Sequence, residues 1–153
     1  MKKKTLYGAY GSNMSNEQMA HRCPNAKVIG TGMLENYKLT FRGKYKGVAN
    51  VESCKGKSVS IVLWEITDDC ETALDLYEGF PTFYIKKQVE ITVDDKPTKA
   101  MIYVMVEEYT NLASKPTDYY FNVIARGYYD NGLDYEPLQT AYADCLKELE
   151  EKN

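Results

Sequence analysis

Glu78 lies in a stretch of sequence that favours acid–base chemistry at a carboxylate. Gly79 follows it directly and Pro81 comes two residues after that, so the preceding helix is expected to end at Glu78. A carboxylate there faces the negative end of the helix dipole, and the aromatic neighbours Tyr77 and Phe80 could desolvate it. Both effects raise the pKa of a glutamate from about 4.3 toward neutrality, as a general base requires. The alternative interpretation is an ordinary exposed glutamate at a helix end.

The turn Tyr10-Gly11-Ser12-Asn13-Met14 is a second candidate for chemistry, as an anion-binding site. It follows a predicted strand, Leu6–Tyr10, and precedes a predicted helix that is capped by Ser15 or Asn16. Small residues at such a position leave backbone N–H groups available to a carboxylate or an oxyanion. The turn has neither the Walker pattern nor the Gly-x-Ser-x-Gly pattern, so Ser12 is a poor candidate for a nucleophile. The alternative interpretation is a simple capped connection between a strand and a helix.

The composition limits which other residues could act as a nucleophile, a base or a metal ligand, because the chain has fourteen tyrosines and a single histidine, His21. Cys23 beside His21 is the only local nucleophile–base pair, but side chains two residues apart on a short helix face different ways. A cysteine hydrolase that uses this pair is kept as a third hypothesis. No cysteines have the spacing of a zinc site, and Asp68-Asp69 and Asp94-Asp95 are typical of a helix cap and a hairpin turn. We therefore expect no metal and no other cofactor.

The net charge of −3 and the lack of a basic stripe argue against nucleic acid as a partner. The one basic cluster, Lys2-Lys3-Lys4, lies at the N-terminus. No apolar run approaches the roughly 20 residues that a membrane-spanning helix needs, and residues 5–13 are too polar for the core of a signal peptide. We therefore expect a cytoplasmic protein that does not bind membranes. Its cysteines are then expected to be reduced thiols: Cys23, Cys54, Cys70 and Cys145.

The secondary-structure elements that must position these residues are expected to form a single domain over residues 1–153. A chain of this length buries roughly 70% of its unfolded surface when it folds. Besides the first strand, β-rich runs occur at residues 27–33, 37–42, 48–52, 58–66, 89–93 and 100–106. The first two of these runs are predicted to form a hairpin through Leu34-Glu35-Asn36. Helices are predicted up to about residue 23 and over residues 67–78, 116–130 and 136–151. This order predicts an α+β fold, with an antiparallel or mixed sheet curled into a small barrel and helices at its sides.

Four motifs resemble those of the γ-glutamylcyclotransferase-like superfamily, including its AIG2-like members. The Tyr-Gly-Ser-Asn signature of the first loop is present at residues 10–13, and Leu-Asp-x-x-Glu-Gly is present at residues 74–79. The helix start Pro-Ser-x-x-Tyr appears with threonine as its second residue at 116–120, and Gly-x-x-x-x-Gly-Leu matches residues 127–133. The similarity spans about residues 5–150, with the motifs in the right order. It implies the family fold, a small mixed β-barrel flanked by helices.

The resemblance also implies an enzyme that converts a γ-glutamyl amino acid or γ-glutamyl amine to 5-oxoproline and releases the amine. The α-amine of the substrate is the nucleophile in this reaction, so neither a serine nor a cysteine is needed. Glu78 would be the general base and acid, and the first loop would hold the γ-glutamyl group. The implied substrate-binding residues are Tyr7, Gly8, Ala9, Tyr10, Gly11, Ser12, Asn13, Met14, Tyr84, Tyr103 and Tyr120. Of these, Tyr103 is expected to hydrogen-bond Glu78 or the substrate, and Tyr120 to line the pocket.

The implied partner is a small γ-glutamyl molecule, the implied reaction is independent of metals, and a homodimer is an open option. Thr117 stands where the family motif has serine, which preserves a hydroxyl. The segment from Glu78 to Tyr84 is one residue shorter than in the form that acts on free γ-glutamyl amino acids. The leaving group is therefore open, and a γ-glutamylamine cyclotransferase is a close relative. The alternative function is a non-catalytic domain that binds a small carboxylate in the same pocket.

Overall fold

Within residues 4–151, which the computed structural model describes, five strands close into a barrel. The strands are β1 (Lys4–Ala9), β2 (Lys27–Arg42), β3 (Val48–Thr67), β4 (Tyr84–Val93) and β5 (Lys96–Met105). They are hydrogen-bonded in the order β1-β3-β2-β4-β5. Among the described strands, β1 and β5 pair in parallel at Tyr7 and Met101, whereas the other pairs are antiparallel. The predicted α+β class with a mixed barrel is confirmed.

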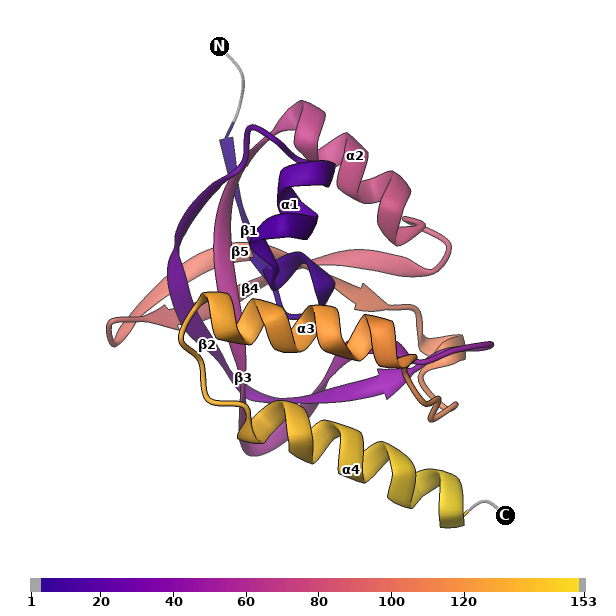
Figure 1. The fold of residues 1–153 in the computed structure, drawn as a ribbon. Coiled ribbons are helices and arrows are strands. Elements are labelled where there is room, and N and C mark those ends of the chain that lie inside the picture. Colours follow the sequence, from indigo (N-terminus) through magenta and orange to yellow (C-terminus); the bar gives the residue numbers. More distant parts are fainter. Residues whose placement is uncertain (1–3, 152–153) are drawn as a thin grey trace.

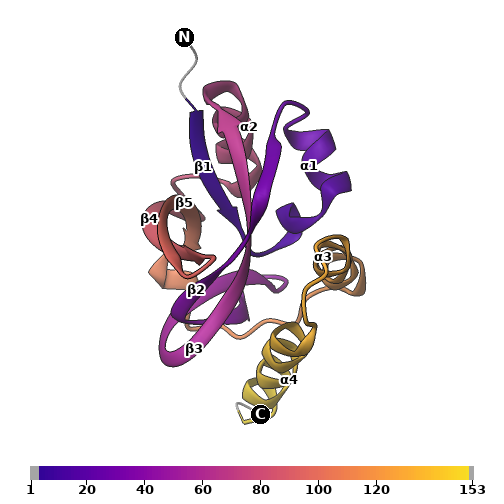
Figure 2. The ribbon, with the colours of Figure 1, turned by 90° about the vertical axis from the view of Figure 1, so that its left-hand side faces the viewer.

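Helices cover one side and one end of this barrel. They are α1 (Asn16–Arg22), α2 (Asp68–Glu78), α3 (Asp118–Asp130) and α4 (Glu136–Glu151), with short 3₁₀ helices at Ser12–Met14 and Glu107–Tyr109. Figure 1 shows α1 and α2 at one end of the barrel, with α3 across its middle. In the view of Figure 2, α1, α3 and α4 lie on one side of β2 and β3, with β4 and β5 on the other. Helices α2, α3 and α4 confirm the predictions for residues 67–78, 116–130 and 136–151.

The strands β2 and β3 are longer than the sequence indicates, because each is continuous across a gap between two predicted runs, at residues 34–36 in β2 and 53–57 in β3. The hairpin expected at residues 34–36 is wrong, because β2 runs through this segment and pairs with β3 on both sides of it. Asn36 has a φ of 65° at the register shift, and its Oδ1 accepts a hydrogen bond of 3.1 Å from the backbone N–H of Gly56. The turn-like residues form a bulge instead, which bends a strand without ending it. The turn lies at residues 43–47.

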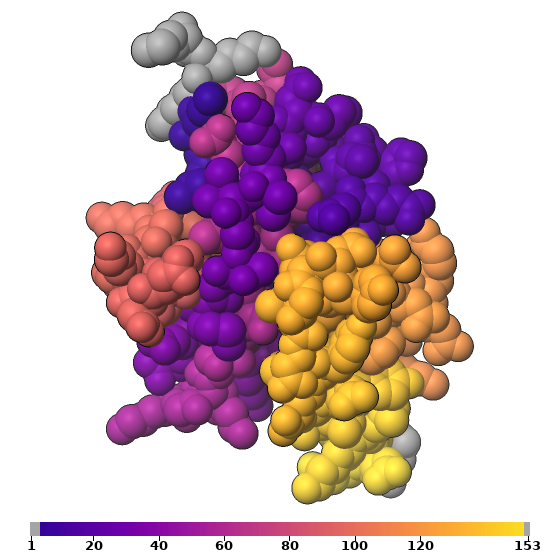
Figure 3. Space-filling model, turned by 60° about the vertical axis from the view of Figure 1, so that its left-hand side comes forward, coloured from indigo at the N-terminus to yellow at the C-terminus, as the bar shows by residue number. Residues whose placement is uncertain are grey.

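Helix α4 is attached to the barrel by an apolar stripe and by ion pairs. Leu138, Ala141 and Cys145 are buried and form this stripe. Arg42 of β2 donates hydrogen bonds to carboxylates of Glu52 at 2.7 Å and Glu148 at 2.6 Å. The arginine is only 7% exposed, so its charge requires these partners. Figure 3 shows α3 and α4 seated on the surface of the long strands, and the N-terminal segment that carries α1 rests against α3.

A disulfide joins Cys23, at the end of α1, to Cys70 in the first turn of α2. The expectation of four reduced thiols is therefore wrong for this pair, while Cys54 and Cys145 are free. The two residues are distant in sequence, but the packing of α1 against α2 brings their Cα atoms to 5.2 Å, within the usual range for a disulfide. None of the helices in residues 4–151 has the length and apolar character to cross a membrane.

Candidate active site

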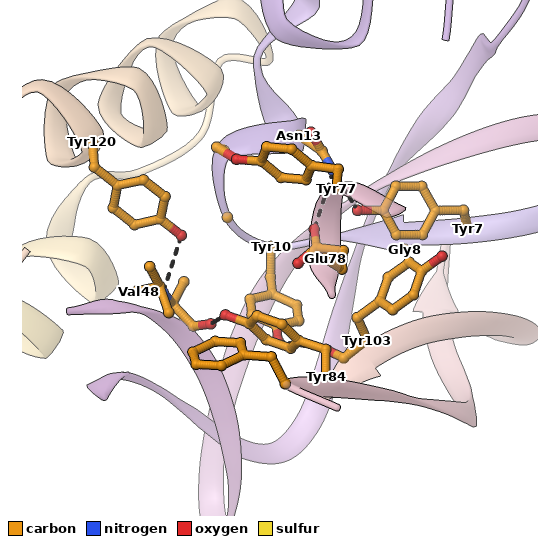
Figure 4. A pocket seen from close by; sticks show the side chains of 14 residues that line it. Tyr7, Gly8, Tyr10, Asn13, Val48, Tyr77, Glu78, Tyr84, Tyr103 and Tyr120 are labelled. Carbon is orange, nitrogen blue, oxygen red and sulfur yellow. Dashed lines mark hydrogen bonds between the residues drawn. The ribbon is translucent and has the colours of Figure 1, made fainter. Parts of the chain in front are cut away.

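A cavity of about 210 Å³ opens between the end of β1, the C-terminus of α2 and the start of α3 (Figure 4). Glu78 lies at its centre, between the first loop and the aromatic side chains of β4 and β5. Among the lining residues, Glu78 supplies the one formal charge. The lining residues are Tyr7, Gly8, Tyr10, Gly11, Ser12, Asn13, Val48, Ala49, Tyr77, Glu78, Phe83, Tyr84, Tyr103 and Tyr120.

The first loop is held in place from behind by the barrel and by α3. Trp64 of β3 donates a hydrogen bond of 3.0 Å from its ring nitrogen to the backbone oxygen of Asn13. On the other side, Asn131 donates through Nδ2 to the backbone oxygen of Met14 at 3.3 Å. Ser15 then caps α1, because its side chain accepts a hydrogen bond from the backbone N–H of Gln18. These contacts fix a turn whose backbone faces the cavity.

Gly127 lets α3 approach this loop closely. A Cβ atom at this position would lie 2.6 Å from Cβ of Met14 and 2.9 Å from the backbone nitrogen of Ser15. These contacts are too short, and the second is to backbone, which cannot rotate away. The Gly-x-x-x-x-Gly-Leu motif therefore has a structural role at its first glycine.

We predict that Gly127→Ala destabilises the protein by about 1–3 kcal/mol, as overpacking does, although alanine favours helices. The displaced loop should also reduce binding of any ligand in the cavity. Urea denaturation measures the first effect. Asn122→Ala, at an exposed position of the same helix, is the matched control and should leave stability nearly unchanged. Equal stability of the two variants would contradict the close packing of α3 on the loop.

Helix α2 delivers Glu78 to the cavity because its two ends are set by local sequence. The side chain of Thr67 accepts a hydrogen bond from the backbone N–H of Cys70, and Gly79 ends the helix in the left-handed conformation with a φ of 68°. Part of the surface of Glu78 is exposed to solvent, so the residue is half-buried. Its carboxylate nevertheless lies in a narrow cavity, where protein atoms surround it. Burial raises the pKa of Glu78 to about 7, and the positive charge of Arg22 opposes that rise. A carboxylate with this pKa both accepts and returns protons at neutral pH.

Three tyrosines shape the cavity through hydrogen bonds to the backbone of the protein itself. Tyr10 donates to the backbone oxygen of Tyr103 at 2.6 Å, and Tyr84 donates to the backbone oxygen of Ala49 at 2.6 Å. Tyr120 accepts a 3.0 Å hydrogen bond from the backbone N–H of Ala49. Burial raises the pKa of Tyr10, Tyr84 and Tyr120 above the ordinary value, so all three are neutral. All three side chains line the cavity.

Tyr103 lines the cavity, but its hydroxyl does not bind Glu78. It donates a 2.6 Å hydrogen bond to Asp75 Oδ1, so the expected hydrogen bond to Glu78 is wrong, and the alternative partner, the substrate, stays a prediction. Asp75 lies one turn before Glu78 on α2 and is also bound by Lys86 of β4 at 2.9 Å. The same lysine binds Glu71 at 2.6 Å. This network clamps α2 to the barrel beside Glu78, and the aspartate of the Leu-Asp-x-x-Glu-Gly motif was the available sequence signal for it.

Two residues of the predicted loop lie outside the lining of the cavity. Ala9 and Met14 are 1% and 0% exposed and pack in the core, where they support the loop from behind. Conversely, Val48, Ala49, Tyr77 and Phe83 line the cavity and were missing from the prediction. Tyr77 and Phe83 flank Glu78 in the sequence, which was a usable signal, whereas Val48 and Ala49 come from a distant strand.

The hypothesis of a cysteine hydrolase is contradicted by the disulfide. Cys23 is bonded to Cys70 and is therefore not available as a thiolate nucleophile, and His21 is exposed on α1. No group of three or more histidine, cysteine or acidic side chains suited to a metal occurs in residues 4–151.

The closed mixed barrel, with one carboxylate opposite a Tyr-Gly-Ser-Asn turn, is the arrangement that the resemblance to γ-glutamylcyclotransferase-like proteins implies. Comparison with known families agrees, because the model of the family "Gamma-glutamyl cyclotransferase, AIG2-like" matches residues 7–130. The chain belongs to this family.

Relatives and solved structures place the whole domain within the same group. The chain is 31% identical over 156 aligned residues to human gamma-glutamylcyclotransferase, covering 95% of this chain and 78% of the relative. It is 32% identical to the bovine protein of the same name, covering 86% and 73%. A solved structure of a gamma-glutamyl cyclotransferase superposes with a TM-score of 0.81 at 27% identity, covering 92% of this chain and 88% of that one.

Proposed function

We propose that this chain is a γ-glutamylcyclotransferase, which converts a γ-glutamyl amino acid or amine to 5-oxoproline and releases the amine. Membership in the family and the names of the relatives support this function. The observation that carries it is Glu78, a carboxylate with a pKa of about 7 that faces the first loop inside a narrow cavity. The residue types suit a reaction in which the substrate supplies its own nucleophile.

In the proposed mechanism, Glu78 accepts a proton from the α-ammonium group of the substrate. The freed amine attacks the γ-carbonyl carbon, which forms the C–N bond of the five-membered ring and a tetrahedral oxyanion. Collapse of this intermediate breaks the bond to the leaving nitrogen, which takes a proton from Glu78. The ring nitrogen then loses its second proton to the ionised Glu78, which passes it on, so that the amine leaves as an ammonium ion. Atoms balance without water or any co-reactant, and the products are 5-oxoproline and the amine. Holding the amine and the carbonyl in ring-closing geometry lowers the barrier further.

We assign the γ-glutamyl group to the first loop. The lining residues Gly11, Ser12 and Asn13 lie at the start of a 3₁₀ helix, where backbone N–H groups lack partners within the helix. Such donors can bind the α-carboxylate or the oxyanion, the latter contribution being about 3 kcal/mol per donor. Tyr7, Gly8 and Tyr10 form the floor of this binding site, and Tyr84, Tyr103 and Tyr120 form its walls. Every step uses Glu78 or the substrate, so we propose a metal-independent reaction, which retention of activity in a chelator would support.

We predict that the rate of 5-oxoproline release falls about tenfold for each pH unit below pH 7. The active base is ionised Glu78, and its pKa of about 7 sets the position of this acid limb. Measurement of kcat/KM from pH 5 to pH 8.5 checks it. A rate that stays constant or rises toward pH 5 would contradict the role of Glu78 as a base.

Protonation of Glu78 does not itself unfold the protein in the acid limb. The pKa of Glu78 is higher in the folded protein than in the unfolded chain, so the folded state binds the proton more tightly. The resulting stabilisation is complete below about pH 4 and is lost as the pH rises through about 7. Protonation of Glu78 thus favours folding, and circular dichroism at each pH provides the control.

An assay of 5-oxoproline release over γ-glutamyl dipeptides, γ-glutamyl amines and glutathione tests the proposal. We expect turnover of at least one class, and the preferred class identifies the leaving group. Binding of γ-glutamyl compounds by calorimetry with no turnover of any would instead favour the non-catalytic carboxylate-binding domain.

A further inference from the structure

Arg22, the last residue of α1, contacts three residues of the cavity wall without lining the cavity itself. Its guanidinium carbon lies 3.5 Å from the centroid of the Tyr77 ring, over the face of that ring. Its Nη1 donates hydrogen bonds to Asn13 Oδ1 and, at 3.4 Å, to Ser12 Oγ. The hydroxyl of Tyr77 in turn lies 3.2 Å from Ser12 Oγ. Arg22 thus sits between the first loop and the C-terminal turn of α2.

The chemistry of the guanidinium determines which way the amide of Asn13 points. Arginine has only hydrogen-bond donors, so the side-chain oxygen of Asn13 must face Arg22. The NH₂ group of Asn13 then necessarily faces the other way. There it donates to Tyr7 at 3.0 Å and to Glu78 Oε1 at 3.5 Å. Asn13 is only 2% exposed, so a reversed amide would leave buried polar groups without partners.

We propose that Arg22 is a positioning residue for Glu78. Arg22 acts on Glu78 through Asn13 and Tyr77. It orients the Asn13 amide as a donor to the carboxylate, and it packs the Tyr77 ring against the first loop at the end of α2. The proposal rests on the function proposed above only for its kinetic consequences, because the contacts themselves are independent of the reaction.

Arg22 also supplies a positive charge that favours the ionised form of Glu78. The other ionisable side chains around Glu78 are tyrosines from β1, the first loop, α2, β4, β5 and α3: Tyr7, Tyr10, Tyr77, Tyr84, Tyr103 and Tyr120. Asp75 also lies on α2, where Lys86 of β4 binds it. In the part of the chain that the structure describes, Arg22 is the one cation that acts on the pKa of Glu78. Loss of Arg22 should therefore raise that pKa.

The experiment compares the wild type with Arg22→Gln, Arg22→Lys and the control Arg126→Gln. Arg126 is an exposed arginine of α3 that pairs with Asp130, away from the cavity. The first readout is the ¹³C chemical shift of the Glu78 carboxyl carbon against pH, assigned by its loss in Glu78→Gln. We expect the titration midpoint to rise by about one pH unit in Arg22→Gln. It should stay near the wild-type midpoint in Arg22→Lys, which keeps the charge, and in Arg126→Gln.

The second readout is 5-oxoproline release. Arg22→Gln should lower kcat at pH 7 by about 10–100-fold, and its acid limb should move to higher pH in step with the titration. Arg22→Lys should show a wild-type acid limb with a reduced kcat, because lysine lacks the planar group that stacks on Tyr77 and orients Asn13. A purely structural role would lower the midpoint of thermal unfolding and leave the acid limb in place.

The two proposals fail in different ways. An unchanged titration of Glu78 in Arg22→Gln overturns the role of Arg22, whether or not the protein turns over γ-glutamyl compounds. If the titration of Glu78 shifts as expected in Arg22→Gln but the wild type releases no 5-oxoproline, the proposed function is overturned and the positioning by Arg22 is supported.

Discussion

Glu78→Gln should lower the rate of 5-oxoproline release by roughly 10²–10⁴-fold, the usual contribution of a general acid–base group. Glutamine has nearly the same shape as glutamate, but it cannot accept the proton of the α-ammonium group. It also cannot return a proton to the leaving amine, so both halves of the proposed mechanism lose the same group. In the cavity, Glu78 is the one lining carboxylate, and no neighbouring lining residue can replace it.

The measurement is release of 5-oxoproline at pH 8, where wild-type Glu78 is ionised. Glu90→Gln, an exposed position of β4, is the matched control and should retain full activity. A Glu78→Gln variant that keeps more than a tenth of the wild-type rate would contradict the assignment. The variant should remain folded and should be more stable than the wild type at pH 8 by about 1–3 kcal/mol, because it no longer buries a carboxylate whose pKa is raised.

Loss of the Cys23–Cys70 disulfide should lower the free energy of unfolding by about 4 kcal/mol. The two cysteines are 47 residues apart, and a cross-link over that length removes much of the conformational entropy of the unfolded chain. Urea denaturation of Cys23→Ser, or of the wild type with and without a reductant, measures the effect. Cys54→Ser, which removes a thiol outside the disulfide, should leave the denaturation midpoint and its response to reductant unchanged.

The disulfide should also influence the candidate active site, because Cys23 directly follows Arg22. Reduction is expected to loosen α1 against α2 and thereby the contacts of Arg22 with Asn13 and Tyr77. We expect the reduced protein to lose activity, as Arg22→Gln does, although less severely.

The stability prediction has its own test. Equal denaturation midpoints with and without reductant would show that the disulfide does not stabilise the fold.

Local features of the structure were predictable because their causes lie within a few residues. Helix α2 begins after Thr67 and ends at Gly79 as expected, since the cap and the left-handed glycine act on adjacent backbone groups. The position of Glu78 at the helix end follows from the same signals. The predicted breaks at residues 34–36 and 54–57 failed, because pairing of β2 with β3 absorbed turn-favouring residues into bulges.

The sequence by itself determined the family, the place of Glu78 at a helix end and the loop that faces it, because each is written in a short motif whose residues are neighbours in the chain. Only the tertiary structure decided what surrounds Glu78. Asn13 is 65 residues from Glu78, the disulfide spans 47 residues, and Tyr103 binds an aspartate 28 residues away. Such contacts depend on how the barrel closes and where α1 packs against α2. The pKa of Glu78 depends on the same packing, because the burial of Glu78 and its closeness to the charge of Arg22 exist only in the folded chain.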